Sequence, residues 1–114
     1  MTETLTDEDR KLVVLARGAL ARAEAPSGAA VRDGNGRTYA GADVRTRTLT
    51  LTGLQVAVAS AISSGARSFE AAVVVNGESD DPGLATLHEL SPEAYAVLTD
   101  TAGAPQRRIG RANA

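Results

Sequence analysis

The sequence predicts a single α/β domain, a three-layer α-β-α sandwich with a mixed sheet of about five strands. The first observation behind this prediction is size and composition: 114 residues, 43% hydrophobic and 23% charged, suit one hydrophobic core. The second is the order of patterns along the chain, in which helical segments alternate with a hairpin and with buried strands. We therefore expect residues 1–114 to form one domain.

A first helix is expected over residues 7–25. Thr6 offers a capping oxygen, and the three carboxylates that follow it would lie at the positive end of the helix dipole. Apolar residues then recur at helical spacing, and Pro26 and Gly28 end the pattern. These apolar residues are Leu12, Leu15, Ala16, Ala19, Leu20 and Ala23.

A β-hairpin is expected over residues 28–44. Short runs with apolar residues flank the tetrapeptide 33–36, whose Asp-Gly and Asn-Gly pairs supply the positive φ angles of a tight turn. Because this glycine pair lies between two strands and no helix follows it directly, we interpret it as a turn and not as a phosphate-binding loop.

A threonine-rich run, residues 46–52, separates the hairpin from the next helix. Its alternation of threonine with larger residues is compatible with a strand. Thr52 and Gln55, however, have the spacing of a capping box, and the residues up to Gly65 are apolar on nearly every side of a helix. We interpret them as a helix buried on more than one face, and the sequence offers no explanation for the threonine run itself.

Four further elements complete the expected order. Residues 71–75 are uniformly apolar, which is typical of a strand covered on both faces of a sheet. A polar loop then leads to a short helix over 82–90. A strand is expected over 94–99 and a weaker one over 106–109, followed by a frayed end.

The composition excludes several classes of protein. The chain has no cysteine, which removes disulfides, thiolate metal sites and cysteine nucleophiles. Its N-terminus is acidic, and no run approaches the ~20 apolar residues of a membrane span, so we expect a cytoplasmic protein that does not bind membranes. Basic residues are scattered and the net charge is −2, so we expect no binding to nucleic acid.

Two polar features are expected to be solvated. His88 is the single histidine, and a metal would need further ligands beside it. The acidic group at Glu78, Asp80 and Asp81 lacks the spacing of a calcium loop, so we interpret it as a turn in solvent.

Three short segments carry a resemblance to a known family. They are Leu-Thr-Asp-Glu-Asp-Arg at 5–10, Ala-Pro-Ser-Gly-Ala-Ala at 25–30 and Ser-Ser-Gly at 63–65. Together with the order of elements, they resemble the small cytidine deaminases over about residues 5–103. The resemblance implies the deaminase fold, a zinc ion in the family's enzymes, and assembly as a homo-oligomer, a dimer or a tetramer.

The family's zinc motifs fall on residues that cannot replace them. A Cys-Ala-Glu triplet opens the buried helix in the family, and here it falls on Thr52 at the ligand and Leu54 at the proton-carrying acid. The later Pro-Cys-x-x-Cys motif puts Gly83 and Thr86 at the two cysteines. A threonine hydroxyl is a poor zinc ligand, and glycine has no side chain that could bind zinc. We therefore expect no catalytic residue, no metal ligand and no cofactor.

Two further positions of the resemblance concern the ribose. Allowing a short deletion, Asp43 and Arg45 take the places of an asparagine and a glutamate that contact the ribose in the family. We regard all six positions as remnants of a pocket: Thr52, Leu54, Gly83, Thr86, Asp43 and Arg45.

The sequence favours a catalytically inactive protein with a structural, binding or regulatory role. Two alternatives stay open. One is a cytidine deaminase with a displaced site, and the other is a sensor that binds a nucleoside-like small ligand without turnover.

Overall fold

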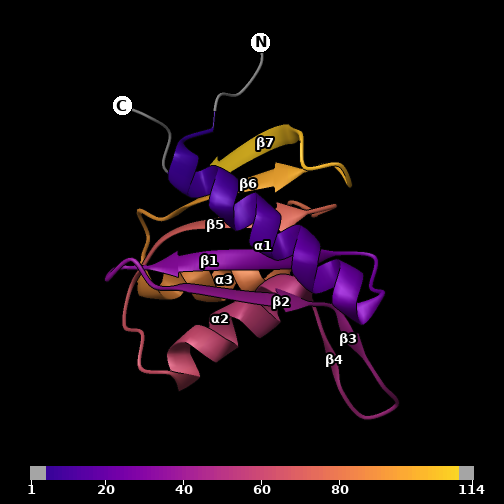
Figure 1. The fold of residues 1–114 in the computed structure, drawn as a ribbon. Coiled ribbons are helices and arrows are strands. Elements are labelled where there is room, and N and C mark those ends of the chain that lie inside the picture. The colour runs from indigo at the N-terminus through magenta and orange to yellow at the C-terminus, as the bar shows by residue number, and fades with distance from the viewer. Residues whose placement is uncertain (1–4, 111–114) are drawn as a thin grey trace.

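The computed structural model describes residues 5–110, which form a five-stranded sheet with helices on both faces (Figure 1). The strand order is β2-β1-β5-β6-β7, and only β5 and β6 run parallel. The predicted α-β-α sandwich with a mixed sheet is therefore confirmed. The elements are α1 (Asp7–Ala23), β1 (Gly28–Asp33), β2 (Thr38–Ala42), β3 (Val44–Arg45), β4 (Thr50–Leu51), α2 (Gly53–Ser63), β5 (Phe69–Val75), α3 (Pro82–Leu90), β6 (Tyr95–Thr99) and β7 (Pro105–Gly110).

Successive side chains of the central strands point to opposite faces of the sheet, and each face carries its own hydrophobic core. Ala30 and Val73 face α1, whereas their neighbours Ala29 and Val74 face α2 and α3. Both faces of β1 and β5 are therefore buried, which explains why these strands lack a polar side. Small alanines in the strands let the helices lie close to the sheet.

The hairpin forms where the sequence predicts it, and Asp33 shapes its turn. One oxygen of this carboxylate accepts hydrogen bonds from the backbone N–H groups of Asn35 and Arg37, both at 2.9 Å. Gly36 adopts a φ of 84°, the left-handed conformation that an L side chain disfavours. The turn chemistry therefore fixes the register of β1 on β2.

The threonine run departs from the expectation. Its ends join β3 and β4 into a separate two-stranded ribbon, in which Val44 pairs with Leu51 and Arg45 with Thr50. The Thr46 hydroxyl accepts the N–H of Leu49 at 2.9 Å and closes the turn. The alternation of the run was compatible with a strand, and setting the strand aside in favour of the helix start at Thr52 was wrong for residues 50–51, because the strand ends directly before the helix cap.

Several boundaries also differ from the sequence-based ranges. The first helix ends at Ala23, two residues early, because Glu24 takes a left-handed conformation with φ 53° and caps it. The last strand, β7, is longer than expected and pairs along β6. The expected frayed end falls on residues 111–114, outside the described part of the chain.

The burial of α2 is less complete than its composition suggests. The helix contacts the sheet on one side and α3 on another, but Ala59, Ser60 and Ile62 are exposed. Small residues such as alanine and serine are often exposed in folded proteins. The number of apolar residues in this helix therefore overstated how much of its surface is buried. Among residues 5–110, no helix combines the length and hydrophobicity needed to cross a membrane.

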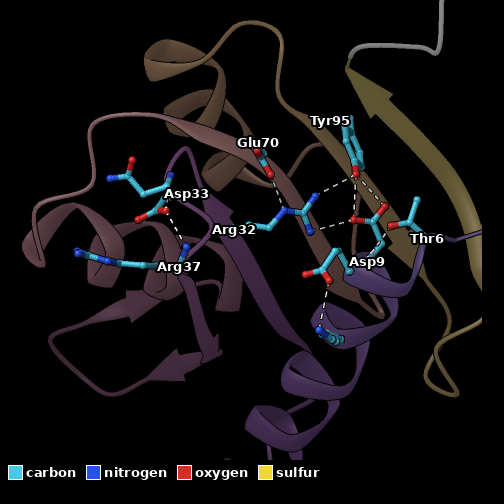
Figure 2. A network of polar contacts seen from close by, with 10 residues as sticks. Thr6, Asp9, Arg32, Asp33, Arg37, Glu70 and Tyr95 are labelled. Atoms are coloured by element: carbon cyan, nitrogen blue, oxygen red, sulfur yellow. Dashed lines mark hydrogen bonds and ion pairs between the residues drawn. The ribbon is translucent and has the colours of Figure 1, made fainter.

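A buried polar network ties the start of α1 to the sheet (Figure 2). Arg32 donates to Asp9 at 3.1 Å, to Glu70 at 2.6 Å and to the Tyr95 hydroxyl at 3.3 Å. The Tyr95 hydroxyl in turn donates to the Asp9 carboxylate at 2.8–2.9 Å. Burial lowers the pKa of Arg32, but its three hydrogen bonds outweigh this and raise it above the ordinary value, so the guanidinium stays charged.

Tyr95 should make stability fall at alkaline pH. Burial and the hydrogen bond to Asp9 raise the pKa of Tyr95 above its ordinary value of 10.0. The unfolded chain therefore loses this proton first, so the stabilisation is complete below pH ~10 and is lost as pH rises through the folded pKa. In a Tyr39→Phe variant, Tyr95 is the single tyrosine, and absorbance at 295 nm should show it ionising later in native than in urea-unfolded protein. Coincident titrations would contradict the network.

Candidate functional site

The N-terminal ends of α2 and α3 meet beside the carboxyl end of β5 and the start of β1. Between them lies a cavity of about 290 Å³ that is open to solvent. This place, just beyond the end of a parallel strand, is where ligands commonly bind in open α/β sheets. The cavity is lined by Pro26, Ser27, Asp43, Thr52, Asn76, Gly77, Glu78, Asp80, Asp81 and Pro82.

Thr52 joins the two helices. It forms the predicted capping box, accepting the N–H of Gln55 at 3.1 Å while the Gln55 side chain accepts the N–H of Thr52 at 2.9 Å. The same hydroxyl donates to the carboxylate of Asp81 at 2.7 Å. Asp81 caps α3 by accepting the N–H of Gly83 at 2.8 Å. One continuous chain of hydrogen bonds therefore links the start of α2 to the start of α3.

Leu54 and Gly83 pack directly against each other. Leu54 is 0% exposed and belongs to the core between the sheet and the two helices. A Cβ atom on Gly83 would lie 2.7 Å from the Leu54 Cγ and 3.0 Å from the backbone nitrogen of Gln55. Real Cβ atoms do not approach so closely, so a side chain at position 83 would require the start of α2 or α3 to shift.

The other three sequence-predicted positions are placed differently. Asp43 lines the cavity and accepts the N–H of Gly53 at 2.7 Å, so it serves the start of α2. Arg45 lies on β3 and lines a neighbouring hollow, away from Thr52. Thr86 is half-buried on α3 and is not among the residues that line the cavity. The structure thus brings together Thr52, Leu54, Gly83 and Asp43.

The donors around this cavity do not fit a zinc ion. The positions implied by the family offer a hydroxyl at Thr52, no side chain at Gly83 and a second hydroxyl at Thr86. The carboxylates of Asp43 and Asp81 already accept backbone N–H groups of the two helix starts. In the described residues, no group of three or more histidine, cysteine, aspartate or glutamate side chains could hold a metal.

Two residues were misjudged from the sequence. Asp81 was assigned to a solvated turn but is only 9% exposed, because it caps α3 and holds Thr52. An aspartate directly before Pro-Gly is a helix-start signature, so this signal was available. His88 was expected in solvent but is half-buried, with Nε2 3.0 Å from the carbonyl oxygen of Ala94. Glu78 and Asp80 are exposed, as predicted.

Removing the Thr52 hydroxyl should loosen the junction of α2 and α3. A Thr52→Val variant loses both the helix cap and the bond to Asp81, so we expect the free energy of unfolding to fall by about 1–2 kcal/mol. Urea denaturation measures this loss. Thr50→Val, on the exposed strand β4, makes the same change of atoms away from the junction and should have little effect. Equal losses in both variants would contradict the role given to Thr52.

Comparison with known proteins agrees with this architecture. The sequence model of the cytidine deaminase-like family matches residues 5–103. No curated protein sequence matches the chain at a significant level.

Solved structures of cytidine deaminases share the fold. The enzyme from Burkholderia pseudomallei is 25% identical, with 93% of each chain covered and a TM-score of 0.74. The enzyme from Mycobacterium leprae is 23% identical over 90% of this chain and 93% of its own, with a TM-score of 0.67. The enzyme from Mycobacterium tuberculosis is 21% identical over 90% of this chain and 91% of its own, with a TM-score of 0.68. The family match spans most of the chain, and the chain therefore belongs to the cytidine deaminase-like family.

Proposed function

We propose that this chain is a catalytically inactive member of its family, with a structural, binding or regulatory role. The observation that carries the proposal is the packing of Leu54 on Gly83 beside the Thr52–Asp81 hydrogen bond. Where a zinc deaminase needs ligands and a proton-carrying acid, this chain has an aliphatic contact and two helix caps.

The chemical deficit is large. Zinc lowers the pKa of its bound water from about 15.7 to about 7, and without a metal that activation is lost. Leu54 cannot carry a proton, so general acid–base catalysis worth roughly 10²–10⁴-fold is lost as well at this position. Loss of both should abolish deamination and not merely slow it.

A cytidine assay tests this proposal. The purified chain, supplied with an equimolar amount of zinc, is incubated with cytidine, and uridine formation is followed by absorbance and chromatography. The cytidine deaminase from Mycobacterium tuberculosis serves as a positive control. We expect uridine to form no faster than in buffer that contains zinc and cytidine without the protein. Saturable turnover that disappears when Thr52 or Thr86 is replaced by valine would refute the proposal.

A second candidate is a sensor that binds a nucleoside-like ligand without turnover. The cavity of about 290 Å³, with hydroxyl, amide and carboxylate groups in its wall, favours it. A ligand at a hundredfold excess over its Kd would stabilise the fold by about 2.7 kcal/mol. Thermal melting with a panel of nucleosides and bases measures this, and the absence of any shift would leave the structural role alone. The cytoplasmic location expected from the sequence stays a prediction.

A further inference from the structure

Strand β7 is an open edge of the five-stranded sheet (Figure 1). It pairs with β6 on one side, and in the described part of the chain no strand pairs with its other side. The opposite edge strand, β2, packs against both α1 and α2, whereas β7 makes its extensive contacts to β6 alone. One side of the β7 backbone therefore keeps N–H and C=O groups that no neighbouring strand bonds.

Consecutive side chains of β7 place a positive charge on each face of the sheet. Arg108 lies opposite Val97, which belongs to the core beneath α1, and its Cζ atom is 4.0 Å from the centre of the Tyr95 ring. Arg107 lies opposite Leu98, which belongs to the core on the other face. Arg107 is exposed, and within residues 5–110 its guanidinium has no hydrogen-bond or ion-pair partner. A strand beside β7 would meet a cation on either face.

Features that block strand pairing lie at one end of β7. Pro105 has no N–H to donate, and the register of β6 on β7 shifts close to it, at the step from Leu98 to Thr99. Residues 107–110 stay in a single register with β6. Within them, Ile109 is half-buried and packs against the core on the α3 side, so it offers an apolar contact next to the two arginines. The open stretch of the edge is therefore residues 107–110.

The two arginines determine which kind of strand this edge accepts. Antiparallel pairing of two copies about these residues would place Arg107 of one copy directly opposite Arg108 of the other. Parallel pairing in register would place each arginine opposite its equivalent. Like charges directly opposite each other destabilise a pair of strands, and opposite charges stabilise it. The edge therefore favours an acidic strand from another protein over a second copy of this chain.

We propose that β7 is a docking edge for an extended acidic segment of another protein, which adds a strand to the sheet. Backbone hydrogen bonds along residues 107–110 hold the segment, as in other complexes formed by strand addition. Two neighbouring carboxylates of the segment face Arg107 and Arg108 on opposite faces, and an apolar residue beside them covers Ile109. No residue of β7 lines the cavity between α2 and α3, so this role goes beyond the proposed function and does not depend on the loss of catalysis.

An NMR titration of isotope-labelled protein with short peptides tests the proposal. The probe is the peptide Ser-Thr-Val-Glu-Glu-Val-Thr-Ser with acetylated and amidated ends, which reads the same in both directions and so allows either strand orientation. We expect the amide signals of residues 107–110 to shift and the exchange of the outward-facing amides with solvent to slow. A peptide with Lys-Lys at its centre should bind at least ~5-fold more weakly, because attraction becomes repulsion at both arginines. Methylation of both glutamate nitrogens should also weaken binding, because it removes a backbone donor that faces β7.

A charge reversal on the protein provides the complementary test. Arg107→Glu leaves the contact of Arg108 with Tyr95 in place and should weaken binding of the acidic peptide at least ~5-fold. Arg67→Glu makes the same change of charge on an exposed residue outside β7 and should leave binding unchanged. Circular dichroism should show that both variants keep the fold.

Several results would overturn the proposal. They are unchanged β7 signals at millimolar acidic peptide, equal binding of the acidic and lysine peptides, and binding that methylation does not weaken. Slow exchange at β7 that increases with protein concentration in the absence of peptide would identify a second copy as the occupant. Binding of a short oligothymidylate at least as tight as that of the acidic peptide would identify a nucleic acid. Either of these also contradicts docking of an acidic protein segment.

Discussion

Replacing Arg32 with methionine should lower the free energy of unfolding by about 3–5 kcal/mol, the loss typical of removing one partner from a buried ion pair. Methionine keeps much of the apolar stem but removes all three hydrogen bonds that Arg32 donates. Asp9, which is 2% exposed, would then keep a buried negative charge with the Tyr95 hydroxyl as its remaining side-chain donor in the network. The helix α1 is fastened to the sheet at this point, so its packing should loosen too.

Equilibrium urea denaturation measures the effect, with Arg67→Met as the matched control on an exposed position. The control should change stability by less than about 0.5 kcal/mol. A loss below about 1 kcal/mol for Arg32→Met would show that the network contributes little, and that the core beneath α1 holds the helix without it.

The second large effect is expected when Leu54 is replaced by glutamate, the acid that the family's zinc motif has at this position. Leu54→Glu places a carboxyl group in a fully buried site among apolar side chains, with Asp81 capping the neighbouring helix. Whether the new group stays charged or becomes protonated, it loses its hydration, so we expect the free energy of unfolding to fall by at least about 3 kcal/mol.

Leu54→Met is the matched control, because it conserves volume and polarity and should cost less than about 1.5 kcal/mol. Thermal and urea melts compare the two. A glutamate variant as stable as the methionine variant would mean that the site still has room and polar partners for an acid. It would contradict the account of Leu54 as part of an apolar core at the start of α2.

Local chemistry allowed most of the fold to be predicted from the sequence. The capping box at Thr52, the turn at Asp33 and the Pro-Gly start of α3 act over a few residues, and each fixes an element where it was expected. The β3–β4 ribbon could not be found this way. Its strands are two residues long, and their pairing depends on a turn closed by the Thr46 hydroxyl.

The polar network lay beyond sequence reasoning for a different reason. An arginine inside the apolar run of β1 signals that a partner is needed, because a buried charge is rarely left alone. Which partner is a matter of topology: Asp9 is 23 positions away, Glu70 is 38 and Tyr95 is 63. No local pattern connects these residues.

In the candidate site, too, some features follow from the sequence and others only from the three-dimensional structure. That Thr52, Leu54, Gly83 and Thr86 lack zinc-binding chemistry followed from side-chain identity alone. That a side chain at position 83 would clash with the start of α2, and that Asp81 bridges the two helices, required the distances between them. Resemblance located the positions, and the structure shows how Leu54, Gly83 and Thr52 pack at the two helix starts.

The metal content of the purified chain tests the central claim most directly. The protein is expressed in zinc-supplemented medium, passed through a desalting column and measured by elemental analysis and native mass spectrometry. We predict much less than one zinc ion per chain, with no mass increment for a bound metal. One zinc ion per chain, lost when Thr52 or Thr86 is replaced by valine, would contradict the account.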